Sequence, residues 1–219
     1  MLYKILKDNR LFLLPYFIIL LLLIPFFFIY TKGEMHLHVN QYHSASFDWF
    51  FRHVTFMGDG LFVIVPAIIL LFFSLRHFVF LACAYLGSGL ITQILKRVFF
   101  EDMARPGRFL AGAQLHLVDG VDLLGGRSFP SGHSTSAFAL FLCLALISKN
   151  KTLKITCFVL ACLTAFSRVY LSQHFIMDIY AGSIIGTLSA IGFYYLFYSR
   201  ERKWHAWNLT KIRKDEYSA

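Results

Sequence analysis

Six long stretches almost free of charged side chains dominate this chain, and no other feature limits its fold as strongly. They cover about residues 11–30, 59–75, 77–95, 130–148, 152–170 and 177–198. An α-helix needs about 20 apolar residues to cross a bilayer, and these stretches approach that length. Of the 219 residues, 58% are hydrophobic and only 15% are charged, whereas a soluble domain carries about 25% charged residues. The sequence therefore predicts an all-α, polytopic membrane protein built as a six-transmembrane-helix bundle.

The spans use most of the chain, so residues 1–219 are expected to form a single membrane domain. The first apolar stretch is longer than the core of a signal peptide and is expected to remain as the first helix. All four cysteines lie within apolar stretches, which predicts small hydrophobic side chains and neither disulfides nor metal ligands. Gly182 and Gly186, four residues apart in the last span, predict a close helix contact inside the monomer.

The basic residues are distributed unevenly across the membrane. If the sides alternate from span to span, 13 of the 21 Lys and Arg residues share the side of the N-terminus. The positive-inside rule then places both termini in the cytoplasm, with the protein in the cytoplasmic (inner) membrane. The net charge of +9 is accordingly interpreted as a topology signal that also contacts anionic membrane lipids. No nucleic-acid partner and no obligate protein partner are expected.

Three polar segments interrupt the apolar pattern, and all three fall on the extracytoplasmic side of this topology. They are residues 95–106, 128–134 and 167–178. Ionisable residues at a membrane boundary are costly unless they are paired or solvated. Three such groups on different helices therefore indicate a shared partner at an active site that faces the extracytoplasmic side.

The residue types in these segments favour a phosphate as that partner. Ser131 and Gly132 stand at the start of a predicted helix, where free backbone N–H groups and the helix dipole attract anions. Lys96, Arg105 and Arg168 supply fixed positive charge, and a guanidinium group can donate two parallel hydrogen bonds to two oxygens of one phosphate. The sequence holds no carboxylate cluster suited to Mg²⁺, so neither a metal nor a cofactor is expected.

Two histidines can divide the catalytic work. His174 precedes Asp178 by four residues, so the carboxylate can accept one imidazole N–H and direct the other nitrogen toward phosphorus. His133, at the start of the other helix, can give a proton to the leaving oxygen and later take one from water. The expected reaction passes through a phosphohistidine at His174.

These motifs resemble the signature of the type-2 phosphatidic acid phosphatase (PAP2) superfamily, which is K-x6-R-P, P-S-G-H and S-R-x5-H-x3-D. The second part matches residues 130–133 and the third matches residues 167–178. The resemblance implies a six-helix core, with His174 as nucleophile, Asp178 as its orienting group and His133 as acid and base. It also implies that Lys96, Arg105, Ser131, Gly132 and Arg168 bind phosphate.

The first motif departs from that signature, because eight residues separate Lys96 from Arg105 where the pattern has six. Either a bulge keeps Lys96 in place or Arg97 takes part, and Lys96 is favoured because Arg97 would still leave seven residues before Arg105.

The extracytoplasmic loop at 106–130 is expected either to select substrates or to form a short interfacial helix. His36, His38 and His43 lack a carboxylate or Cys companion at ligand spacing and are expected to be solvated or interfacial.

Together these features predict a metal-independent integral-membrane phosphatase acting on a lipid phosphomonoester or pyrophosphate. Candidate substrates are undecaprenyl pyrophosphate, phosphatidylglycerol phosphate, phosphatidic acid and the phosphates of lipid A, and the sequence does not choose among them. One alternative is a lipid phosphotransferase with the same site. Another is a non-catalytic membrane protein that binds or translocates lipid.

Overall fold

The computed structural model describes residues 1–122 and 124–200, and all regular structure within them is helical. The α-helices are α1 (Leu2–Asp8), α2 (Arg10–Ile29), α3 (Lys32–Asn40), α4 (Ala45–Val54), α5 (Ile64–Phe73), α6 (Leu75–Ile94), α7 (Pro106–Phe109), α8 (Gly132–Ile147), α9 (Lys151–Tyr170) and α10 (Ile176–Tyr198). A 3₁₀ turn, η1 (Thr55–Gly58), follows α4, and a π-helical turn, η2 (Leu95–Phe99), continues α6.

Within the described part of the chain, four helices are long and apolar enough to cross a membrane, namely α2, α6 with its π-helical extension, α9 and α10. The other two predicted spans correspond to shorter apolar helices, α5 and α8. The helix expected over residues 59–75 is shorter than predicted, because α5 begins only at Ile64 and contains ten residues. An all-helical membrane protein is therefore confirmed, whereas the number of six spans stays a prediction.

Helix α8 forms the centre of the bundle, and α6, α9 and α10 pack around it. Eleven of its sixteen residues are buried, on all sides of the helix. Small residues allow α10 to approach α8 closely: a Cβ on Gly182 would lie 2.5 Å from the Ser131 carbonyl oxygen, and one on Gly186 would collide with the Thr135 carbonyl oxygen. The predicted glycine contact inside the monomer is confirmed, and it fixes the start of α8 against the start of α10.

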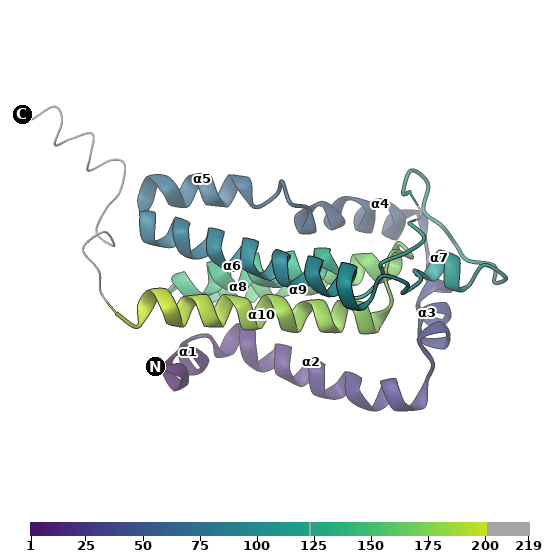
Figure 1. Cartoon of the computed structure of the whole chain (residues 1–219), viewed down its shortest axis with the longest axis horizontal. Coiled ribbons are helices and arrows are strands. Elements are labelled where there is room, and N and C mark those ends of the chain that lie inside the picture. Colours follow the sequence, from purple (N-terminus) through teal and green to yellow (C-terminus); the bar gives the residue numbers. More distant parts are fainter. Residues whose placement is uncertain (123, 201–219) are drawn as a thin grey trace, which may run out of the picture.

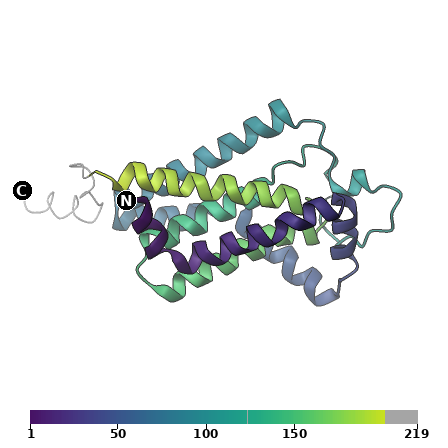
Figure 2. The same cartoon turned by 90° about the horizontal axis from the view of Figure 1, so that it is seen from below.

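Helix α2 lies on the outside of this core. Its first half packs inward through Phe12, Leu13 and Tyr16, and the Tyr16 hydroxyl lies 3.3 Å from Ser183 Oγ on α10. Its second half diverges from α10 (Figure 1), and the view from below shows α2 crossing the near face of the bundle (Figure 2).

The two ends of the bundle differ in composition. Met1 and the last described residues of α10 share one end, whereas α3, α7 and the long loop before α8 lie at the other (Figure 1). The three polar segments lie at the second end. Five basic residues counted in the topology argument lie outside the described residues, namely Arg202, Lys203, Lys211, Arg213 and Lys214.

Candidate active site

The three polar segments meet where α8 and α10 begin and α9 ends. The backbone N–H of Ser131 donates to the Asp178 carbonyl oxygen at 2.9 Å, which ties the start of α8 to the first turn of α10. The N–H of Ser128 donates to the Met103 carbonyl oxygen at 2.9 Å, which connects the segment after α6. Backbone hydrogen bonds thus hold segments from different parts of the chain in one place.

His174 and Asp178 form a buried pair at the start of α10. His174 is 1% exposed and Asp178 is 4% exposed. His174 Nδ1 lies 3.3 Å from Asp178 Oδ2, and the same oxygen accepts hydrogen bonds from the Ser128 hydroxyl and the Phe175 backbone N–H. Burial lowers the pKa of His174 to about 3, although Asp178 opposes the shift. The imidazole is therefore neutral at physiological pH, and with its proton on Nδ1 it keeps a lone pair on Nε2.

His133 has a carboxylate partner that the motif analysis did not identify. Its Nε2 lies 2.8 Å from Oδ1 of Asp59, in the turn between η1 and α5. Gly58 lets this turn pack directly against the histidine, because a Cβ there would lie 2.8 Å from the His133 Cβ. Burial raises the pKa of Asp59, and Arg168 opposes the shift. The Asp59 carboxylate can hold and stabilise a proton on His133.

Three cations surround these two pairs. Lys96, Arg105 and Arg168 are each 7–8% exposed, and Lys96 interacts electrostatically with both arginines and with Asp178. Arg105 Nε donates to the Gly126 carbonyl oxygen at 2.9 Å, and Arg168 Nη1 donates to Thr55 Oγ1 at 2.6 Å. The buried Arg168 Nε has no hydrogen-bond partner among the described residues. Buried cations in excess of carboxylates are stabilised by an anion, and a phosphate fits the arrangement.

The start of α8 offers further donors. Ser131 caps the helix by accepting the Ser134 N–H at 3.4 Å. A Cβ on Gly132 would meet no atom within 4 Å, so open space lies before the first turn of the helix. Backbone N–H groups at this position, with the positive end of the helix dipole, suit a phosphate oxygen.

A π-helical turn at the end of α6 can accommodate one of the two extra residues in the first motif. The Phe100 N–H donates to the Leu95 carbonyl oxygen at 3.0 Å, the i to i+5 bond of a π-helical turn. Such a turn inserts an additional residue into a helix and often occurs at functional sites. It turns Lys96 inward, where Nζ donates to the Arg127 carbonyl oxygen at 3.1 Å, whereas Arg97 is exposed. The geometry supports Lys96 over Arg97.

Motif spacing also missed the residues that position the cations and the Asp178 carboxylate. Ser128 binds Asp178, Thr55 binds Arg168, and the Gln173 side chain accepts from Arg105 and donates to the Asp122 carbonyl oxygen. Ser128 and Gln173 lie beside motif residues in the sequence, a signal that could have identified them. Thr55 lies in η1 and Asp59 directly after it, outside the three polar segments, and neither carries a comparable signal.

The expectation that His36 is solvated or interfacial is wrong. Its ring is fully buried, packs edge-on against Phe175, and its Nε2 lies 3.1 Å from the Ser172 hydroxyl. Ser172 has a φ of 54° in the turn before His174. His36 is therefore part of the packing behind that turn, and this position depends on α3 folding back over the bundle end. His38 and His43 are exposed, as expected.

The loop at 106–130 packs over α3 and α4. The His116 N–H donates to Asn40 Oδ1 at 2.8 Å, and His116 Nε2 lies 2.9 Å from Asp48 Oδ2. Val118 joins a small apolar cluster with Phe51 and residues at the end of α9. Among the described residues of the loop, the four-residue α7 is the one helix, and a role in substrate selection stays a prediction.

An apolar cavity of about 490 Å³ lies between α2, α3 and the start of α10. Leu23, Phe26, Met35 and Val39 contribute to its walls. Ile176, which also lines it, is two residues from both His174 and Asp178. An apolar space that reaches the first turn of the helix carrying Asp178 suits a substrate that has a phosphate at one end and a hydrocarbon chain at the other.

Comparisons with known proteins agree with this geometry. The PAP2 superfamily profile matches residues 77–202. The chain is 25% identical over 181 residues to the lipid A 4′-phosphatase of Porphyromonas gingivalis, covering 80% of this chain and 76% of that protein. The crystal structure of Aquifex aeolicus LpxE superposes on this chain with a TM-score of 0.62 at 27% sequence identity, covering 73% of this chain and 92% of that one. A PAP2 type phosphatidylglycerolphosphate phosphatase from Bacillus subtilis shares the fold, with a TM-score of 0.60 at 22% identity, covering 90% of this chain and 99% of that one. The matched region includes all three motifs and most of the bundle, so the chain belongs to the PAP2 superfamily.

Proposed function

We propose that this PAP2 superfamily membrane protein, a hydrolase of lipid phosphates, removes phosphate from a lipid phosphomonoester or pyrophosphate by way of a phosphohistidine at His174. The observation that carries the proposal is the buried His174–Asp178 pair, 3.3 Å apart, among Lys96, Arg105 and Arg168. A neutral, oriented imidazole among cations that can stabilise a phosphoryl group suits nucleophilic attack on phosphorus.

The proposed reaction has two steps. His174 Nε2 attacks phosphorus in line, the bond from phosphorus to the lipid oxygen breaks, and His133 donates a proton to that oxygen. A water molecule then attacks the phosphorus of the phosphohistidine, His133 takes its proton, the bond from phosphorus to His174 Nε2 breaks, and inorganic phosphate leaves. The three cations, the Ser131 hydroxyl and the Gly132 backbone N–H stabilise the charge on the phosphoryl oxygens in both steps. Because side chains supply that charge, the reaction is proposed to need no metal.

A lipid A phosphate is the substrate that we would test first among the four candidates. The P. gingivalis lipid A 4′-phosphatase is similar over 80% of this chain, and the apolar cavity beside Ile176 has room for part of an acyl chain. We further propose that the termini are cytoplasmic and that the site faces the other side of the inner membrane. The opposite positions of Met1 and the polar segments in the bundle support this topology (Figure 1).

The test is phosphate release by detergent-purified protein, in EDTA, from lipid A, phosphatidylglycerol phosphate, phosphatidic acid and undecaprenyl pyrophosphate. His174→Ala should reduce release below a few per cent of wild type, and Asp178→Asn should retain slightly more because the attacking atom remains. The matched control is His53→Ala, because His53 is exposed and its ring is hydrogen-bonded to the Trp49 carbonyl oxygen. Release by His174→Ala near the wild-type rate, or a requirement for Mg²⁺, would contradict the mechanism.

A further inference from the structure

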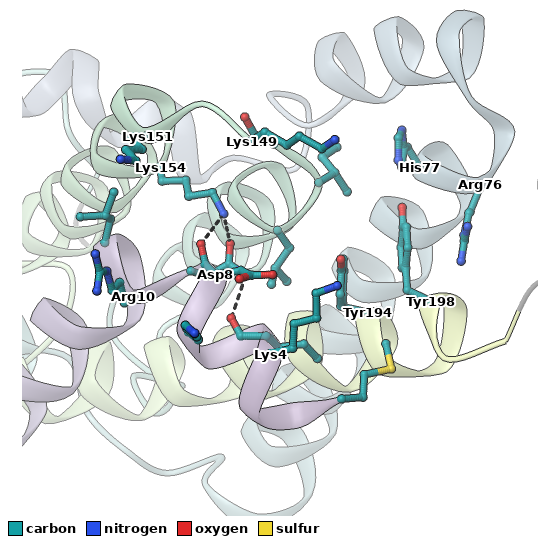
Figure 3. A pocket seen from close by; sticks show the side chains of 18 residues that line it. Lys4, Asp8, Arg10, Arg76, His77, Lys149, Lys151, Lys154, Tyr194 and Tyr198 are labelled. Atoms are coloured by element: carbon teal, nitrogen blue, oxygen red, sulfur yellow. Dashed lines mark hydrogen bonds between the residues drawn. The ribbon is translucent and has the colours of Figure 1, made fainter.

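A second cavity lies at the end of the bundle opposite the candidate active site. It has a volume of about 950 Å³ and is formed by α1, the start of α2, the start of α6, the connection from α8 to α9, and the last turns of α10. Figure 3 shows basic side chains around it, with Lys4 and Lys149 coming from opposite walls. None of these residues belongs to the PAP2 motifs, so the proposed reaction leaves this cavity without a role.

The lining of this cavity is strongly cationic. Seven of its residues are Lys or Arg, and Asp8 is the single carboxylate among the described residues that line it. No ion pair within residues 1–122 and 124–200 involves Lys4, Lys7, Arg10, Lys149 or Lys151. Cations gathered in a concave space repel one another, and an anion with several negative oxygens relieves that repulsion.

Hydrogen bonds fix one wall of the cavity. Lys154, which is 5% exposed, donates from Nζ to the Asp8 carbonyl oxygen at 2.8 Å and to Asn9 Oδ1. Asn9 Nδ2 in turn donates to the Ile5 carbonyl oxygen at 2.9 Å. These bonds hold the break between α1 and α2, so that α1 lies across the end of the bundle. In the opposite wall, the rings of Tyr194 and Tyr198 are stacked, with their centroids 4.3 Å apart.

The surroundings favour a lipid over a free anion. Leu2, Tyr3 and Leu6 on α1 are exposed, whereas Ile5 on the same helix is buried. A short helix with apolar side chains facing outward and lysines beside them lies naturally in the membrane interface. The cavity is also much larger than one phosphate needs and is comparable to pockets for whole small molecules.

We propose that this cavity binds the phosphate headgroup of an anionic phospholipid from the leaflet opposite the active site. Basic pockets at the ends of transmembrane helices recognise such headgroups through their phosphate oxygens. The site would fasten α1 to the bundle, because the ligand would contact lysines of α1 and of the α8–α9 connection together.

The experiment measures lipid binding and does not depend on turnover. Full-length protein in a neutral detergent is titrated with phosphatidylglycerol, and bound lipid is counted by native mass spectrometry. Parallel titrations use phosphatidylcholine, inorganic phosphate and glycerol 3-phosphate. The test variant is Lys4→Gln with Lys149→Gln, two exposed side chains whose loss leaves the core intact. The matched control is Arg97→Gln with Arg52→Gln, which removes the same charge from exposed residues at the other end.

The proposal expects phosphatidylglycerol to bind in preference to phosphatidylcholine, and expects the test variant to weaken that binding by about tenfold or more, since two basic residues that attract the headgroup are lost. The control variant should bind like wild type, and unfolding temperatures in lipid-free detergent should match across all three proteins. Equal weakening in both variants would overturn the proposal in favour of general attraction between charges. Equal binding of phosphatidylcholine would also overturn it, as would displacement of the lipid by inorganic phosphate or glycerol 3-phosphate at similar concentrations.

Discussion

The contact between Gly182 and Ser131 offers a direct test of whether helix packing sets the active-site geometry. In Gly182→Ala, the new Cβ would lie 2.5 Å from the Ser131 carbonyl oxygen, where ordinary contacts begin at 3.4 Å. The start of α8 must therefore move by about 1 Å, and the atom in the way belongs to the backbone. Gly182 is one helical turn after Asp178, whose carbonyl oxygen accepts the Ser131 N–H at 2.9 Å. The substitution should thus separate the proposed phosphate donors of α8 from His174.

Two quantities should respond. Overpacking of this kind costs about 1–3 kcal/mol of folding free energy, which lowers the unfolding temperature of a chain of this size by several degrees. A displacement near 1 Å between reacting groups can lower activity by about a hundredfold, so kcat/KM should fall by about that factor. Gly192→Ala on the same helix is the matched control, because a Cβ there meets nothing within 4 Å. If both variants unfolded at the same temperature and released phosphate equally fast, the reasoning about this contact would be refuted.

Three further predictions concern single residues. Asp59→Asn should lower kcat/KM by up to about a hundredfold by removing the carboxylate partner of His133. Burial raises the pKa of Asp59, so when the pH is lowered, wild-type activity should begin to fall at a higher pH than with an ordinary aspartate. This loss of activity at low pH should be absent in the variant. Burial lowers the pKa of His36 to about 4, so the unfolded chain binds a proton between about pH 6.5 and 4 that the folded chain does not. The unfolding temperature should therefore decrease as the pH is lowered from 6.5 to 4, and it should decrease less in His36→Gln. An equal decrease in both proteins would exclude His36 as the cause of this pH dependence. Val39→Phe should narrow the apolar cavity and raise KM for a long-chain lipid phosphate while leaving kcat for a short-chain analogue near wild type, and an equal effect on both substrates would count against an acyl-chain role.

The sequence by itself determined the helical membrane character and the residues at which to look for chemistry. Long apolar stretches permit helices because a bilayer leaves no other partner for backbone groups. The four-residue spacing of His174 and Asp178 lets the carboxylate in the first turn of α10 reach the imidazole in the turn just before the helix, a local relation that needs no tertiary information. Gly182 and Gly186 likewise indicated a close helix contact from their spacing, although not which helix they contact.

Only the tertiary structure decided which distant residues meet. The pairing of Asp59 with His133, of Thr55 with Arg168 and of Ser128 with Asp178 depends on the angles at which helices and turns pack. The burial of His36 follows from α3 folding back over the bundle end. The basic cavity follows from α1 turning across the other end, where Lys154 holds it. Apolar periodicity shows which face of a helix is buried but not its neighbour, and charge counts show the side of the membrane but not the shape that gathers those charges.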